Sequence, residues 1–180
     1  MKRLFWFAGA LLLALAAGWS NECGAADETY AYKVKAAFLL NFAKFTTWPA
    51  SCWSADNPYM LLAIVGSDPF GAALQGVEKQ QIGGRSVRLR HFQAMTDETC
   101  QSQMLFVSKS EQANVEGIVK TIGKKPVVTV SDIEGFADAG GMLEFKDKDG
   151  RLAFVVNNSK ARENGVQISS SLLNLALEVH

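Results

Sequence analysis

Three short, continuous runs of apolar residues constrain the fold of this chain most strongly. They lie at residues 60–65, 104–107 and 127–130. Runs of this length without polar alternation are typical of strands that are buried on both faces of a sheet. The intervening segments 70–80 and 111–122 can form helices, so strands and helices alternate along the chain. This alternation predicts a three-layer α/β fold around a mixed sheet.

The C-terminal part predicts a β-hairpin followed by a helix. Residues 142–146 and 151–156 flank the turn sequence Asp-Lys-Asp-Gly at 147–150. A glycine at the end of such a turn favours a hairpin. Asn157 can cap a short helix, and residues 169–177 predict a final helix. Residues 87–90 alternate as a half-exposed edge strand does. The pair Gly140-Gly141 before the hairpin indicates backbone that Cβ atoms would obstruct.

The first predicted helix, residues 28–47, has an unusually wide apolar surface. It ends before Trp48-Pro49, because proline disfavours helix in the residue before it. One stripe carries Val34, Phe38, Phe42 and Phe45, and the apolar surface extends to Leu39, Leu40 and Ala43. Such a helix is buried on more than one side, either by its own domain or by a second protein.

We expect Leu39, Leu40 and Ala43 to lie at a partner interface, in a homodimer or with another protein. Asn41 lies inside the apolar stripe, where a buried amide needs hydrogen-bond partners. We expect it to be a satisfied core amide.

Residues 1–26 have the pattern of a cleavable secretory signal. Lys2 and Arg3 precede the apolar segment 4–19, and small residues follow at 24–26. The apolar run is shorter than a membrane span requires. We expect cleavage after Ala26, which leaves residues 27–180 as one domain in the periplasm. The polar residues before Cys23 argue against lipidation at that position.

Composition excludes one class of partner. Eighteen basic and eighteen acidic residues are dispersed along the chain, which gives no electrostatic footprint for nucleic acid. No later segment is apolar enough to span a membrane.

Cys52 and Cys100 remain after signal cleavage, an even number in an oxidising compartment. They predict a disulfide between Cys52 and Cys100, and two separate thiols are the alternative.

The sequence contains little that indicates catalysis. Its two histidines are His91 and His180, and no metal-ligand pair, nucleophile motif or phosphate loop is present. We therefore expect no catalytic residues, no metal and no cofactor.

The turn at residues 66–71 is the strongest local candidate for a ligand site, with Gly66, Ser67, Asp68 and Gly71 as the candidate residues. It follows a central strand at the sheet edge where α/β proteins bind ligands. Ordinary helix capping by Asp68 before Pro69 is the alternative.

The mature chain resembles the YfiR family of exported bacterial proteins along nearly its whole length. The first helix matches as YKVKAAFLLNFAKF (32–45) with Trp48-Pro49. The other matching segments are VGSDPFG (65–71), LFVS (105–108), TVSD (129–132), GGMLEF (140–145), FVVN (154–157) and VQISSSLLNLA (166–176), together with Cys100 and Phe136.

This resemblance implies a Rossmann-like α/β domain that acts as a periplasmic regulator and not as an enzyme. Such regulators restrain an inner-membrane diguanylate cyclase through its periplasmic sensor domain, and so control cyclic di-GMP signalling and biofilm formation. An outer-membrane lipoprotein can sequester the regulator.

Family members often pair the cysteine that matches Cys100 with a cysteine in the first buried strand. Here that strand position is Ala63, which leaves either Cys52 as a substitute or no disulfide. Two other functions compete with the regulatory one. The first is a periplasmic small-molecule-binding protein that reports to a membrane kinase or receptor, and the second is an enzyme with an unrecognised site.

Overall fold

The computed structural model describes residues 22–53 and 58–180. The predicted signal sequence lies mostly outside these residues. The helices are α1 (Glu22–Lys44), α2 (Val115–Ile122), α3 (Asn158–Glu163) and α4 (Ser170–Leu173), with 3-10 segments η1 (Ala50–Cys52), η2 (Gly71–Leu74), η3 (Thr99–Gln101) and η4 (Lys109–Asn114). The strands are β1 (Thr46–Thr47), β2 (Met60–Val65), β3 (Gln81–Ile82), β4 (Arg85–Phe92), β5 (Met104–Val107), β6 (Val128–Ser131), β7 (Leu143–Lys148), β8 (Arg151–Val156), β9 (Gln167–Ile168) and β10 (Glu178–Val179).

The described residues form a mixed, mostly parallel sheet in the order β10-β8-β7-β6-β5-β2-β4-β3. The three apolar runs became its central strands β2, β5 and β6, which are buried at every position. Strands β4, β2, β5, β6 and β7 are mutually parallel. The predicted hairpin is confirmed, because β7 and β8 pair antiparallel from Leu143–Val156 to Lys148–Arg151.

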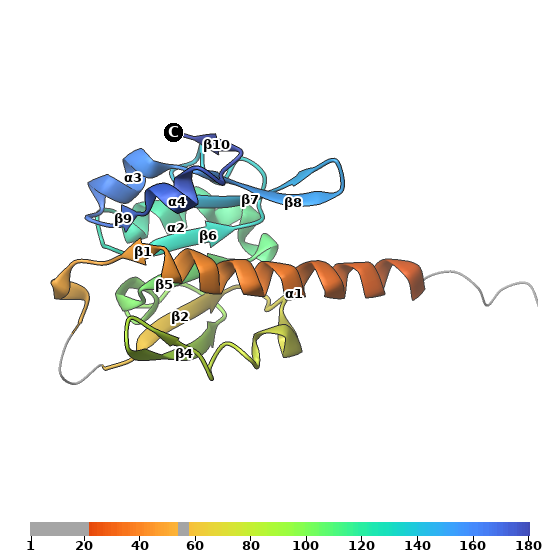
Figure 1. The fold of residues 1–180 in the computed structure, drawn as a ribbon, viewed down its shortest axis with the longest axis horizontal. Coiled ribbons are helices and arrows are strands. Elements are labelled where there is room, and N and C mark those ends of the chain that lie inside the picture. Colours follow the sequence, from red (N-terminus) through yellow and green to blue (C-terminus); the bar gives the residue numbers. More distant parts are fainter. Residues whose placement is uncertain (1–21, 54–57) are drawn as a thin grey trace, which may run out of the picture.

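Alternate side chains of the central strands build two apolar cores on opposite faces of the sheet. Leu62 and Ile64 of β2 point to the face that α1 covers, together with Leu39 and Phe42 of that helix. The adjacent residues of β2 point to the face that α2 covers. Figure 1 shows α1 crossing the sheet as one long helix. The domain therefore has helices on both faces, as the alternating sequence pattern predicts.

Helix α1 ends three residues earlier than the sequence predicts. Its last residue is Lys44, and the following Thr46–Thr47 pair antiparallel with β9 instead of continuing the helix. The Thr46 hydroxyl donates to the Phe42 carbonyl oxygen at 2.7 Å, which satisfies one of the open carbonyls at the helix end. The Trp48 indole N–H donates to the Gln103 carbonyl oxygen at 2.9 Å and ties the exit of the helix to β5.

Two predicted helices are largely wrong. Residues 70–80 form only η2 and turns, and the φ of +48° at Gly71 keeps Phe70 from sharing a right-handed helix with the residues that follow. Residues 169–177 form only the short helix α4. Beyond α4 the Leu177 N–H donates to the Phe154 carbonyl oxygen, and β10 pairs with β8. The segment after α4 therefore pairs with the free edge of the β7–β8 hairpin and does not continue the helix.

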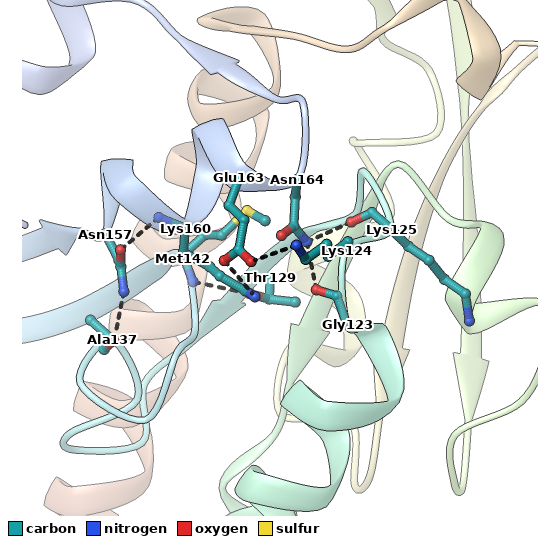
Figure 2. Close-up of polar contacts among 10 residues, drawn as sticks. All are labelled: Gly123, Lys124, Lys125, Thr129, Ala137, Met142, Asn157, Lys160, Glu163 and Asn164. Carbon is teal, nitrogen blue, oxygen red and sulfur yellow. Dashed lines mark hydrogen bonds and ion pairs between the residues drawn. The ribbon is translucent and has the colours of Figure 1, made fainter.

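Side-chain hydrogen bonds fix α3 against the rest of the domain (Figure 2). As predicted, Asn157 caps this helix, because its Oδ1 accepts from the Lys160 N–H at 2.9 Å. Its Nδ2 donates to the Ala137 carbonyl oxygen at 3.0 Å. At the other end of α3, Asn164 Nδ2 donates to the carbonyl oxygens of Gly123 and Lys125 at 3.1 and 2.7 Å. These bonds join α3 to the loop that contains Ala137 and to the loop that follows α2.

The pair Gly140-Gly141 occupies backbone that side chains would obstruct. Gly140 has a φ of +98°, which L-residues rarely adopt. A Cβ on Gly141 would lie 2.2 Å from the ring carbons of Phe136 and 2.7 Å from its carbonyl oxygen. The close approach places the buried Phe136 ring under the loop that leads into β7.

Candidate functional site

Side chains of the protein satisfy three backbone amides of the predicted ligand turn at residues 66–71. Asp68 Oδ1 accepts from the N–H groups of Phe70 and Gly71 at 2.8 and 3.4 Å. The Ser67 N–H donates to Ser110 Oγ at 2.8 Å. A Cβ on Gly66 would lie 2.4 Å from that same oxygen. The geometry fits the alternative reading, in which Asp68 caps the turn.

The predicted partner-interface residues of α1 face inward. Leu39 is fully buried and Ala43 is 1 % exposed, so both belong to the domain's own core. Leu40 is half-buried and packs against that core. The assignment of Leu39 and Ala43 to an interface is therefore wrong, because the sheet and the C-terminal segment cover more of α1 than one sheet face would.

Asn41 is exposed, which also corrects the prediction that it is a core amide. Within the apolar stripe of α1, Phe42 is fully buried, whereas the other members are less covered. Val34 and Phe38 are half-buried, and Phe45 is 42 % exposed. Large apolar side chains are exposed elsewhere too, at Tyr30, Leu175, Leu177 and Val179.

The predicted disulfide between Cys52 and Cys100 is not formed, and both cysteines are free thiols. Cys52 packs against the core on the α1 face of the sheet, whereas Cys100 belongs to the core on the α2 face. The sheet thus separates the two residues. Ala63 lies in the same core as Cys100. Burial raises the pKa of the Cys52 thiol.

A groove of about 790 Å³ lies between α1 and the β7–β8 hairpin. The hairpin projects toward the same end of the molecule as the N-terminal half of α1 (Figure 1). Aromatic and aliphatic side chains from both elements form its walls, and charged side chains lie among them. The lining residues are Tyr30, Ala31, Val34, Lys35, Phe38, Lys109, Asp132, Phe145, Lys146, Asp147, Gly150, Arg151 and Leu152.

Asp132 is the buried polar residue of this groove. It follows β6 directly, at the carboxyl end of a central parallel strand, and its side chain is only 4 % exposed. Its Oδ2 accepts from the Tyr32 hydroxyl at 2.8 Å and from the Lys35 ammonium at 2.5 Å, both on α1. The Lys109 ammonium lies 4.0 Å away. Asp132 Oδ1 has no hydrogen-bond donor among the described residues.

A second buried carboxylate supports the hairpin side of the groove. Glu144 on β7 accepts from the N–H groups of Gly135 and Ala137 at 3.0 and 2.9 Å. Lys146, which lines the groove, lies 2.7 Å from the same carboxylate. The hydrogen bond to Glu144 raises the pKa of Lys146. Glu144 therefore fixes the loop after β6 and holds one groove cation in place.

Sequence reasoning missed Asp132 and Lys35 as site residues. Two signals could have found them. Lys35 is a cation set between Val34 and Ala36 in the apolar part of the helix, and Asp132 follows a buried strand at the edge where α/β sheets bind ligands. Their pairing depends on a contact across 97 positions, which single-sequence patterns do not reveal.

The described residues contain neither a cluster of metal ligands nor a membrane-spanning helix. No group of three or more His, Cys, Asp or Glu side chains there is arranged to hold a metal ion. No helix in residues 22–53 or 58–180 has the length and apolar character of a membrane span.

The fold and the groove define an α/β domain with an open groove beside its longest helix. Residues 32–177 match the model of the YfiR/HmsC-like family, and the chain belongs to this family. Its members are periplasmic regulators of diguanylate cyclases and are generally non-catalytic. No curated relative matches the sequence.

Among solved structures, the fold is similar to that of a conserved domain protein from Vibrio cholerae O1 biovar El Tor strain N16961. The TM-score is 0.56 at 10 % sequence identity. The match covers 81 % of this chain and 60 % of the Vibrio protein. At this identity the similarity concerns the fold alone.

Proposed function

We propose that this protein is a periplasmic regulator that binds the periplasmic sensor domain of an inner-membrane diguanylate cyclase and restrains the enzyme. The family match over residues 32–177 carries this proposal, because it extends from the first buried turn of α1 to the residue before β10. Restraint of this kind controls cyclic di-GMP synthesis, and so biofilm formation, without contact between the regulator and the nucleotide.

The proposed restraint requires only that the regulator bind two conformations of the sensor domain with different affinities. A regulator that binds the inactive conformation of the sensor domain more tightly than the active one shifts the cyclase toward the inactive state. The shift is limited by the ratio of the two affinities. An outer-membrane lipoprotein that binds the same regulator would compete for it and release the cyclase. Association of two copies of the chain is a further regulatory step under this proposal.

Export by removal of residues 1–26 is part of the proposal. Among the α1 residues whose side chains are described, the first buried one is Tyr32, six positions after Ala26. Cleavage at that point shortens the start of α1 and leaves Tyr32, Lys35 and the whole described core in the mature protein. The mature chain therefore retains every contact that Asp132 makes with α1.

Direct binding tests the proposal. Mature protein, residues 27–180, is titrated by calorimetry against purified periplasmic sensor domains of the membrane diguanylate cyclases from the same organism. We expect saturable one-site binding to at least one sensor domain. Absence of binding to every such domain would overturn the proposed function. The periplasmic domain of a membrane histidine kinase serves as the control partner.

A further inference from the structure

The groove between α1 and the β7–β8 hairpin combines three chemical features that together select one kind of ligand. We propose that it docks an extended, acidic segment of a partner protein that inserts an apolar side chain. This inference rests on the proposed function only for the identity of the partner, since the ligand chemistry is argued from the groove itself.

The first feature is an apolar wall that is already ordered. Phe38 packs edge-on against Phe145 and Phe154, with ring centroids 6.1 and 5.9 Å apart. Tyr30 and Val34 precede Phe38 at intervals of four, so the three lie along one side of α1. Tyr30 is 67 % exposed, a large apolar surface left without cover at one end of the groove. An apolar side chain inserted here buries area on both surfaces.

The second feature is an excess of positive charge. Four cationic and two acidic side chains line the groove. Lys35 and Lys146 are held by the buried carboxylates Asp132 and Glu144. Arg151 forms no ion pair with any described residue, and Lys109 is 63 % exposed with its ammonium 4.0 Å from Asp132. These two cations are available to acidic side chains of a ligand.

The third feature is the acceptor Asp132 Oδ1. It is buried and has no donor among the described residues, which is costly for a carboxylate oxygen. An N–H group of a bound segment would supply the missing donor once a small shift of the Asp132 side chain opens this oxygen to the groove. A polypeptide provides backbone N–H groups, acidic side chains and apolar side chains within a few residues, so it satisfies all three features at once.

A labelled peptide tests the groove without knowledge of the partner. The probe is the capped pentapeptide Glu-Phe-Glu-Leu-Glu, and its matched control is Lys-Phe-Lys-Leu-Lys. Binding to the mature protein is followed by fluorescence anisotropy at low and high salt. We expect the acidic peptide to bind more tightly than the basic one, and its affinity to fall with added salt.

Matched variants locate the binding. Arg151→Glu and Tyr30→Ala change exposed groove residues, so the fold should survive, and thermal unfolding verifies this. Lys120→Glu on α2 and Leu175→Ala are exposed controls of the same chemistry outside the groove lining. We expect each groove variant to weaken peptide binding roughly two- to five-fold, and the controls to leave it unchanged.

Equal binding of the two peptides, or equal losses in groove and control variants, would overturn the inference. Titration of the same variants with the cyclase sensor domain separates the two proposals. If the sensor domain binds and Arg151→Glu and Tyr30→Ala leave its affinity unchanged, the groove is not the docking site and the regulatory function stands. If the acidic peptide binds in the groove but no sensor domain binds, the regulatory function fails and the groove inference stands.

Discussion

The Lys35 ammonium lies 2.5 Å from the Asp132 carboxylate and joins α1 to the carboxyl end of β6. Both side chains are almost fully buried, and the Lys35 ammonium also lies 4.2 Å from the centroid of the Tyr32 ring. The pair therefore fixes the position of α1 at the point where the helix forms one wall of the groove. The ion pair therefore serves both the stability of the domain and the shape of the proposed binding groove.

Replacing Lys35 with methionine should destabilise the protein strongly. The substitution leaves Asp132 as a buried carboxylate without its nearest cation, and breaking a buried pair in this way costs about 3–5 kcal/mol. Urea unfolding measures the change. Lys33→Met on the exposed side of the same helix is the control, with an expected change within about 0.5 kcal/mol. Similar losses in the two variants would contradict the importance assigned to the pair.

Replacing Gly141 and replacing Gly117 with alanine should change the free energy of unfolding in opposite directions. A Cβ on Gly141 meets the Phe136 ring and backbone, so Gly141→Ala should cost about 1–3 kcal/mol through overpacking. A Cβ on Gly117, inside α2, meets no atom within 4 Å. Gly117→Ala should stabilise by about 0.5–1 kcal/mol, because glycine is a poor helix former. A stable Gly141→Ala protein would show that the loop before β7 adapts freely.

Glutamate at Leu39 should unfold the domain, whereas glutamate at Asn41 should not. Leu39 is fully buried in the α1 core, and a charge there has no partner. Asn41 is exposed two positions further along. Circular dichroism and thermal unfolding distinguish the two variants. A folded Leu39→Glu protein with altered association would restore the original assignment of Leu39 to an interface.

Both cysteines of the mature chain should be free. The two thiols lie in separate cores on opposite faces of the sheet. Denatured, unreduced protein should therefore take up two alkylating labels per chain, measured by mass spectrometry. In the native protein, alkylation of Cys52 should be slow at neutral pH, because its raised pKa leaves little thiolate. A chain that labels only after reduction would contradict this arrangement.

The sequence predicted the sheet better than the helices. Runs such as Met60–Val65 are apolar at every position, so burial on both faces follows from composition alone. The predicted helix at 70–80 was wrong, because only the 3-10 segment Gly71–Leu74 forms there, followed by turns that no periodicity reveals. The predicted burial of Asn41 and the predicted interface position of Leu39 were wrong for a different reason. A helix that is apolar on several sides does not show which side the C-terminal segment covers.

The candidate site was the least predictable part of the molecule. The ligand turn was chosen from local chemistry, but Asp68 uses its carboxylate to satisfy that turn. Asp132, Lys35 and Arg151 come from segments far apart in the sequence, and only the packing of α1 against the sheet and the hairpin brings them together. Sites built from long-range contacts carry no local spacing to recognise.

The rate of cyclic di-GMP synthesis tests the proposed restraint most directly. A full-length diguanylate cyclase from the same organism, selected by sensor-domain binding, is reconstituted in nanodiscs with its periplasmic domain accessible. It is supplied with GTP, and product is measured with and without saturating mature protein. The account predicts a several-fold lower rate when the protein is bound, with no effect on a cyclase that lacks its periplasmic domain. An unchanged rate despite demonstrated binding would contradict it.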